Sequence, residues 1–326
     1  MLFADFVGFL IGLSCALAIA ELQDHDDEES YEEESNASAS TRTPSAPAKK
    51  QKLAHRPETE YPQSVSIAAI LKAGQLVKPK ERRRVTFAIE AFDVKKREWS
   101  SLESLEILVE TEKFSSGGFR DAFKGVTGVA LSSTNGQHQT WVVKTYKPNA
   151  IKAIEDTMQS NLEDHTRKQV QMHTAAREIT KCFASKVPSN FGACFKYNKV
   201  YYTVFDGNPA TIEEFVEGEF QKYINNTGKV CKPVDCTDEE EVVIDKAECL
   251  VHYSYDSSKK KLMLLDIQGS HYNLYDPEIA TEELMCSESS EIYFCCGNLS
   301  TMSINVFKET HICNKYCKMM NLPSPI

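Results

Sequence analysis

Clusters of β-branched and aromatic residues predict strands through much of the chain after residue 105. Such runs are typical of β-strands, and we expect them over Glu106–Thr111, Thr140–Tyr146, Val200–Phe205 and Leu262–Ile267. Phe114–Lys124, with its paired glycines, is expected to be a turn between strands. Gly269 is expected to end the last of these strands.

Helices are predicted mainly in the second half of the chain. The long charged segment Ile151–Ser185 contains no proline or glycine, which favours a helix. A shorter helix is expected at Lys246–Ser254, and a terminal helix or a pair of short helices at Ile304–Met320. An acidic linker is expected at Thr211–Phe220 and a loop at Cys231–Glu241. Strands followed by helices indicate an α+β protein with two lobes.

The N-terminal third is predicted to lie outside the folded domain. Residues 21–99 run from acidic through Ser/Thr/Ala/Pro-rich to basic sequence, with few apolar side chains for a core, so they should be largely disordered. Ser64–Val77 carries a weak helical pattern, and Lys80–Arg84 is expected to be a solvated face or a sorting signal. The domain is placed at 100–326, with lobes at about 100–210 and 211–326.

Met1–Ala20 is almost wholly apolar and ends in small residues, which predicts a cleaved signal peptide. An uncleaved anchor is the alternative. A genuine signal peptide would direct the chain into the secretory pathway, and otherwise a cytoplasmic location is expected. The eleven cysteines would allow disulfides in an oxidising compartment.

The composition is that of a globular protein. A chain of 326 residues with 41% hydrophobic residues can form one large domain or two modest ones. Its formal net charge of -10 argues against nucleic-acid binding as the main role.

Oxygen-bearing side chains follow the apolar run that begins at Leu262. Asp266 and Gln268 lie at its end, and Asp276 follows directly before a proline. Carboxylate and amide oxygens in this arrangement suit a divalent cation. An ordinary strand followed by an Asp-Pro turn would give the same pattern.

The first strands carry a candidate phosphate-binding pattern. Gly117 and Gly118 would let backbone N–H groups approach phosphate oxygens, and Arg120 would add positive charge. Lys144 lies among apolar strand residues, where a buried amine needs an anion. The alternatives are a plain hairpin turn and a solvent-facing lysine. The connector Thr211–Gly228 could offer backbone groups to a flat base, or be an acidic surface turn.

A candidate metal site lies near the C-terminus. His311, Cys313 and Cys317 form H-x-C-x3-C, and imidazole and thiolate ligands at this spacing suit tetrahedral zinc. His252 is the best candidate for a fourth ligand, which would make the site structural. If the chain is secreted, Cys313 and Cys317 could instead form disulfides.

Taken in order, these segments resemble the α-kinase family of atypical protein kinases. The resemblance spans about two-thirds of the chain and rests on SSGGFRDAFKG, WVVKTYK, IEEFVEGEFQKYINNTG, LLDIQGS with YDPEI, GNLS and HICNKYC. It implies a two-lobed atypical protein-kinase fold of the α+β class. The N-lobe sheet would be mostly antiparallel and the C-lobe stabilised by zinc.

The resemblance also implies a role for each candidate residue. Gly117, Gly118 and Arg120 would cover the ATP phosphates, Lys144 would contact them, and Glu213 (or its neighbour Glu214) would lie beside the adenine. Asp266 matches the catalytic aspartate. The implied metal ligands are Gln268 and Asp276 for Mg²⁺, and His252, His311, Cys313 and Cys317 for structural Zn²⁺.

The expected activity is transfer of the ATP γ-phosphate to a serine or threonine of a protein substrate. The alternatives are a pseudokinase with little turnover and a secreted binding protein built on the same fold. Ser300 stands where the family usually has glycine, and Ser270 and His271 stand where Val-Gly is common. These departures concern substrate choice.

Overall fold

The computed structural model describes residues 80–127, 139–158, 160–284, 294–295 and 297–325. The predicted signal peptide, and the expected disorder and weak helix between residues 21 and 79, lie outside the described residues. Within the described ranges, no helix is both long and apolar enough to cross a membrane.

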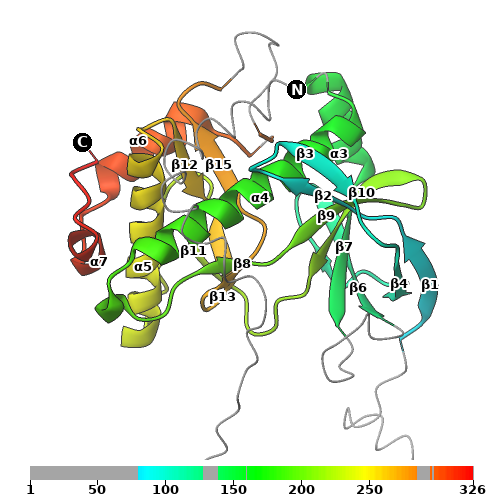
Figure 1. Cartoon of the computed structure of the whole chain (residues 1–326), viewed down its shortest axis with the longest axis horizontal. Coiled ribbons are helices and arrows are strands. Elements are labelled where there is room, and N and C mark those ends of the chain that lie inside the picture. The colour runs from blue at the N-terminus through cyan, green and yellow to red at the C-terminus, as the bar shows by residue number, and fades with distance from the viewer. Residues whose placement is uncertain (1–79, 128–138, 159, 285–293, 296, 326) are drawn as a thin grey trace, which may run out of the picture. The chain divides into compact units, whose positions relative to one another are not determined.

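A nine-stranded antiparallel sheet forms the N-terminal lobe (Figure 1). Its strands are β1 (Arg82–Phe87), β2 (Glu90–Asp93), β3 (Glu98–Ser101), β4 (Leu105–Glu110), β5 (Ser115–Ser116), β6 (Arg120–Thr127), β7 (Thr140–Tyr146), β9 (Val200–Phe205) and β10 (Asn208–Glu214). The order is β1-β4-β6-β7-β10-β9-β2-β3, and β5 pairs with β6. The glycine turn, Lys144 and Glu213 therefore lie on or beside adjacent strands in the middle of the sheet.

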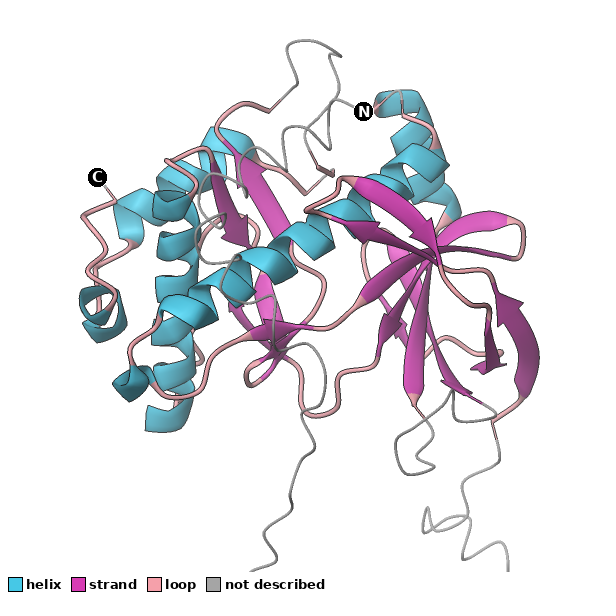
Figure 2. Ribbon diagram, viewed as in Figure 1, coloured by secondary structure: helices cyan, strands magenta, loops and turns pink. Residues whose placement is uncertain are grey.

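Helices and two small sheets form the C-terminal lobe (Figure 2). The helices are α5 (Asp238–Ser257), α6 (Ser300–Thr310) and α7 (Lys315–Met319). One sheet has the order β11 (Gln221–Ile224), β13 (Ile267–Ser270), β14 (Asn273–Leu274) and β8 (Lys196–Tyr197), and the other pairs β12 (Leu262–Leu265) with β15 (Glu278–Thr281). The long helix α4 (Leu162–Lys186) contacts both β9 and α5, so it connects the two lobes (Figure 1).

The predicted helices are confirmed with changed bounds. The segment expected to be one long helix starts with α3 (Pro148–Lys152) and a π-helical turn (Ala153–Thr157), and α4 begins afresh after Asn161, whose side chain accepts the backbone N–H of Asp164. The helix expected from Lys246 begins earlier, at Asp238, so the end of the segment predicted to be a loop, Cys231–Glu241, is helical instead. Thr237 and Glu240 form a capping box there, which satisfies backbone N–H groups at the helix start.

The strands at Thr140–Tyr146 and Val200–Phe205 are confirmed, but two neighbouring predictions are wrong. The first residues of the expected acidic linker, Thr211–Glu214, complete β10. Gly269 lies inside β13 and does not end it. A Cβ at Gly269 would come within 2.0 Å of the Asn273 carbonyl oxygen, so glycine permits the close approach of β13 and β14.

The sheet begins before the predicted domain boundary at residue 100, because β1 and β2 precede that residue. The basic run Lys80–Arg84 is exposed, but Lys80 pairs with Glu110 and Arg84 with Glu106, each at 2.6 Å. Those acids lie on β4, further along the chain, so the composition of the basic run alone does not show that its charges are paired. The segment therefore has the composition of a linker and the structure of an edge strand.

Two hydrophobic cores support the lobes. The smaller one lies under the sheet and includes Phe87, Ile107 and Val143, all fully buried. The larger one extends through α4, α5 and the small sheets, with Phe183 and Leu250 among its fully buried members. The apolar residues of β12 belong to this larger core, so the strand that precedes Asp266 is held in place by packing.

Candidate active site

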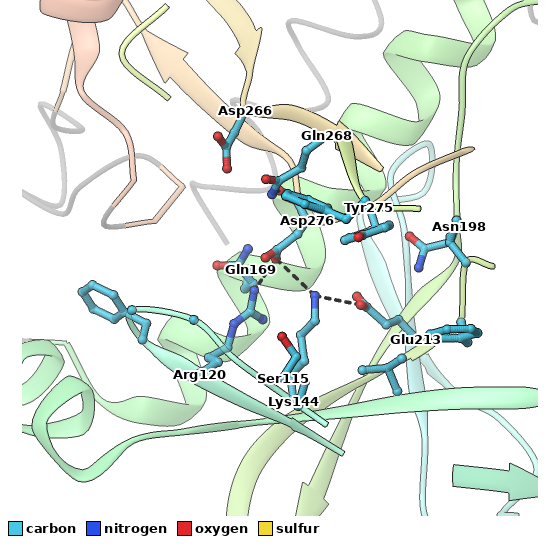
Figure 3. Close-up of a pocket in the computed structure, with 18 of the residues that line it drawn as sticks. Ser115, Arg120, Lys144, Gln169, Asn198, Glu213, Asp266, Gln268, Tyr275 and Asp276 are labelled. Atoms are coloured by element: carbon cyan, nitrogen blue, oxygen red, sulfur yellow. Dashed lines mark hydrogen bonds and ion pairs between the residues drawn. The ribbon is translucent and has the colours of Figure 1, made fainter. Parts of the chain in front are cut away.

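A cavity of about 860 Å³ lies between the sheet and the C-terminal lobe, and the predicted active-site residues line it (Figure 3). The glycine turn, β7 and β10 contribute from the sheet. The chain after β12 and the segment before β15 contribute from the C-terminal lobe. The lining includes Gly117, Gly118, Arg120, Lys144, Glu213, Asp266, Gln268 and Asp276.

Lys144 connects the two sides of this cavity. Its Nζ lies 2.7 Å from Glu213 Oε1 and 3.5 Å from Asp276 Oδ1 (Figure 3). Lys144 is paired with Thr211 across β7 and β10. Because side chains alternate along a strand, Glu213 shares the face of Thr211 and can reach the lysine. The lysine is 9% exposed, so the solvent-facing alternative is wrong.

Asp276 is held by two cations. Arg120 pairs with it in addition to Lys144, and the other guanidinium nitrogen of Arg120 contacts Thr211 Oγ1 at 3.4 Å. Burial would raise the pKa of Asp276, but Lys144 and Arg120 hold it below its usual range. Burial raises the pKa of Glu213 despite its contact with Lys144.

Asp266 lies between β12 and β13, not within one strand as predicted. Its backbone has φ of 51°, a left-handed conformation in which Asp and Asn are enriched among non-glycine residues. Its Oδ1 accepts a hydrogen bond from Lys222 Nζ at 2.7 Å. Burial raises the pKa of Asp266, and Lys222 acts against that rise.

Lys222 is a candidate site residue that the sequence did not indicate. It lies on β11 opposite Gln268 of β13, a register that places its amine beside Asp266. Lys222 belongs to the connector Thr211–Gly228, for which the sequence predicts only contacts with a flat base. Nothing in the spacing of the two residues along the chain predicts the pairing.

Gln268 and Asp276 meet because β13 and β14 form a hairpin. Gln268 Nε2 donates to the backbone carbonyl of Asp276 at 3.0 Å. Since the amide nitrogen is used in this bond, the amide oxygen of Gln268 remains available to a cation. The carboxylate of Asp276 and this amide are oxygen donors of the type that Mg²⁺ prefers, so the residues present fit the predicted metal.

Glu278 is a further acid in the cavity wall, at the start of β15. Its Oε2 is buried and has no hydrogen-bond partner among the described residues. Burial first, and then the charges of Asp276 and Asp266, raise the pKa of Glu278 to about 8.

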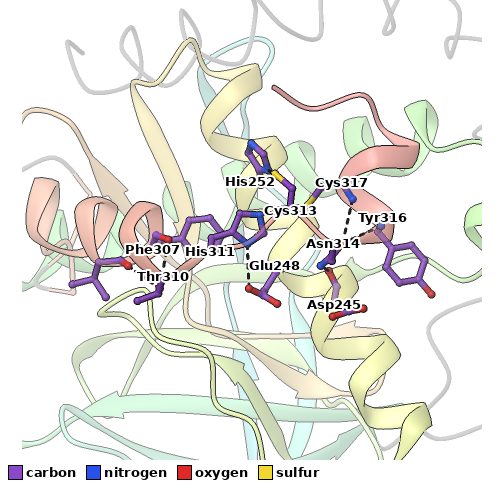
Figure 4. A network of polar contacts seen from close by, with 11 residues as sticks. Asp245, Glu248, His252, Phe307, Thr310, His311, Cys313, Asn314, Tyr316 and Cys317 are labelled. Atoms are coloured by element: carbon purple, nitrogen blue, oxygen red, sulfur yellow. Dashed lines mark hydrogen bonds and ion pairs between the residues drawn. The ribbon is translucent and has the colours of Figure 1, made fainter. Parts of the chain in front are cut away.

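The four predicted zinc ligands lie together where α5, which carries His252, meets the end of α6 and the start of α7 (Figure 4). The donor atoms of His252, His311, Cys313 and Cys317 all lie within 4.8 Å of one another. Cys313 Sγ lies 3.8 Å from His252 Nδ1, and Cys317 Sγ lies 3.5 Å from His311 Nε2. Tetrahedral zinc with ordinary bond lengths places its ligands about 3.4–3.8 Å apart, so this set fits the ion.

Glu248 supports the cluster from α5. Its Oε1 lies 3.1 Å from His311 Nδ1, which leaves Nε2 of the same ring directed at Cys317 (Figure 4). In zinc sites, a histidine that binds the metal through one ring nitrogen commonly donates the N–H of the other to a carboxylate. Cys313 and Cys317 are free thiols, so the disulfide alternative does not hold for them. Among the described cysteines, Cys182 is disulfide-bonded.

A curled antiparallel sheet that faces a helical lobe across such a cavity, with a buried Lys–Glu pair, defines a protein-kinase-like class of fold. The comparison with family models is more specific. The chain belongs to the alpha-kinase family, whose model matches residues 115–317.

Known relatives agree with this assignment. The human transient receptor potential cation channel subfamily M member 6 is 26% identical over 210 residues, which are 64% of this chain and 10% of that protein. Alpha-protein kinase 1 of Dictyostelium discoideum is 27% identical over 237 residues, which are 72% of this chain and 15% of that protein. The chain thus matches only about a tenth to a seventh of the length of these relatives.

The crystal structure of the alpha-kinase domain of myosin heavy chain kinase A in complex with ADP has the same fold. It superposes with a TM-score of 0.58 at 22% identity, covering 77% of this chain and 100% of that one.

Proposed function

We propose that this chain is an ATP- and Mg²⁺-dependent protein kinase that phosphorylates serine or threonine. The observation that carries the proposal is the meeting of Lys144 from the sheet with Asp276 from the C-terminal lobe, 3.5 Å apart, in the cavity that Asp266 also lines. Family membership and the ADP-bound relative support a nucleotide as the occupant of this cavity.

The residues divide the work of phosphoryl transfer. Lys144, oriented by Glu213, would neutralise charge on the phosphate chain. Gln268 and Asp276 would hold Mg²⁺, which when bound supplies further neutralisation of the phosphates. Arg120 and the glycine turn lie on the sheet side of the cavity, where the phosphates would be covered.

Asp266 would act on the protein substrate. Its carboxylate would accept a hydrogen bond from the acceptor hydroxyl and take the proton as the hydroxyl oxygen attacks the γ-phosphorus. The bond between that phosphorus and the bridging oxygen breaks, and ADP leaves with the oxygen. Lys222 would hold the carboxylate in place during this step. A structure that retains this set of residues favours turnover over a pseudokinase.

The test is phosphate transfer from labelled ATP to a general acceptor protein, with phosphoamino-acid analysis of the product. Asp266→Asn should lower turnover by about 10²–10⁴-fold, the usual contribution of a general base. Asp206→Asn is a matched control, because Asp206 also has positive φ but lies exposed on the β9–β10 turn. Wild-type activity in Asp266→Asn, or phosphotyrosine as the product, would contradict the proposal.

A further inference from the structure

Glu278 lines the cavity with Glu213, Asp266 and Asp276, and it is the one of these four acids for which no cation partner is described. Asp266 pairs with Lys222, while Glu213 and Asp276 share Lys144. Glu278 makes none of the ion pairs described, and its Oε2 is buried without a hydrogen bond. A buried carboxylate without a partner is costly, so such an acid either keeps a proton or binds a cation in its place.

The carboxylate of Glu278 lies in a space that exists because residue 297 is a glycine. A Cβ at Gly297 would lie 2.2 Å from Glu278 Cδ and 2.4 Å from each of its two oxygens. Gly297 has no positive φ, so it is glycine because of space and not because of backbone conformation. Any larger residue at position 297 would displace the acid from its present position.

Glu278 also lies next to the acids already assigned to catalysis. It follows Asp276 by two residues, and Asp266, Asp276 and Glu278 all line the same cavity. Three carboxylates and the amide oxygen of Gln268 exceed what one hard cation with bound phosphates requires of a protein. Lys144 and Lys222 are already engaged by other acids.

We propose that Glu278, together with Asp276, binds a second divalent cation beside the one assigned to Gln268 and Asp276. Oxygen-only donors select Mg²⁺ or Mn²⁺. A compact ion fits the site better than a basic side chain of the protein substrate, because Glu278 Oε2 has no contact with solvent. A second ion held there would add to the neutralisation of charge on the phosphates. This inference rests on the proposed function.

The experiment counts ions and nucleotide separately. Equilibrium dialysis of the full chain against Mn²⁺ and ADP should give two Mn²⁺ per bound ADP. Glu278→Gln keeps the size of the side chain and should weaken the second ion by at least about tenfold, as the loss of even an outer partner of a metal ligand does. ADP and the first Mn²⁺ should bind as before.

Two further variants guard against misfolding and general charge effects. Gly297→Ala should produce the same loss with Glu278 still present, because the methyl group displaces the carboxylate. Glu282→Gln is the matched control, since Glu282 follows the same strand but is exposed and pairs with Lys261 at 2.9 Å. It should retain both ions, and all variants should unfold as cooperatively as the wild type.

Each outcome decides between the two proposals. One Mn²⁺ per ADP in the wild type, or two in Glu278→Gln, would overturn the second ion while leaving the kinase proposal intact. A raised KM for the acceptor protein in Glu278→Gln, with both ions retained, would assign Glu278 to substrate recognition. A chain that binds no ADP would overturn the kinase proposal as well.

Discussion

Lys222 and Asp266 form an ion pair of 2.7 Å although 44 residues separate them in the chain. The contact is possible because β11 and β13 are neighbours and Lys222 faces Gln268. The side chain of Asp266 is 14% exposed and that of Lys222 is 35% exposed, so the lysine is the more accessible partner. This geometry makes Lys222 a positioning residue for Asp266.

Lys222→Met should lower kcat by about 10²-fold, the usual loss when one preorganised donor is removed from a reacting centre. The KM for ATP should change little, because the amine of Lys222 bonds to Asp266, whose role is with the acceptor hydroxyl and not with the nucleotide. Lys222→Arg should recover part of the activity. Lys229→Met, an exposed lysine just after β11, is the control. An effect confined to ATP affinity would contradict the assignment.

Glu213 and Glu214 can be distinguished by mutation. Glu213 contacts Lys144, whereas Glu214 Oε2 accepts from the backbone N–H of Lys199 on the other side of β10. Glu213→Gln should therefore lower kcat/KM for ATP by about 10–100-fold, the equivalent of one hydrogen bond between charged groups. Glu214→Gln should leave kcat/KM unchanged. The reverse result would place the functional glutamate at position 214.

Local sequence predicted those parts of the site that depend on one strand or one short motif. Lys144 could be placed on β7 because its neighbours are β-branched and aromatic, and H-x-C-x3-C indicated a metal without knowledge of the fold. The contacts that decide the chemistry need information from two distant segments. Lys222 with Asp266 depends on strand register, and Glu248 with His311 depends on the packing of α5 against the C-terminal helices.

Two further differences have physical causes of the same kind. Strand β1 was not predicted because charges of its basic run are neutralised by acids of β4, which lie well beyond that run in the sequence. The break at Asp266 was not predicted because a positive φ leaves little trace in a sequence when the residue is not glycine.

The His/Cys cluster should bind about one zinc per chain. Removal of the ion by a chelator should lower Tm by more than about 5 °C, because the cluster joins α5 to the last helices. Glu248→Gln should weaken zinc about 10–100-fold, since Glu248 orients His311. Glu239→Gln, an exposed acid on the same helix, serves as the control. Metal analysis that finds no zinc in chain purified under reducing conditions would refute this.

His173 should make the stability depend on pH. Its ring is buried on α4, 3% exposed, and its Nε2 lies 3.1 Å from the backbone carbonyl of Asn198. Burial, with the positive charge of Lys144 nearby, lowers the pKa of His173 to about 3, from 6.5 in an exposed histidine. Between these values the unfolded chain binds the proton and the folded chain does not. The contribution is therefore fully present above about pH 6.5 and is lost as the pH falls toward 3.

The free energy of unfolding from urea titrations at pH 7, 6 and 5 tests this expectation. His173 alone should contribute a slope of up to about 1.4 kcal/mol per pH unit, and His173→Gln should remove that part while keeping a donor for the Asn198 carbonyl. Zinc ligands take up protons in the same range, so the informative quantity is the difference between variant and wild type at equal zinc. His271→Gln, which changes an exposed histidine, is the matched control variant. Equal slopes for His173→Gln and wild type would show that the folded protein takes up this proton without cost.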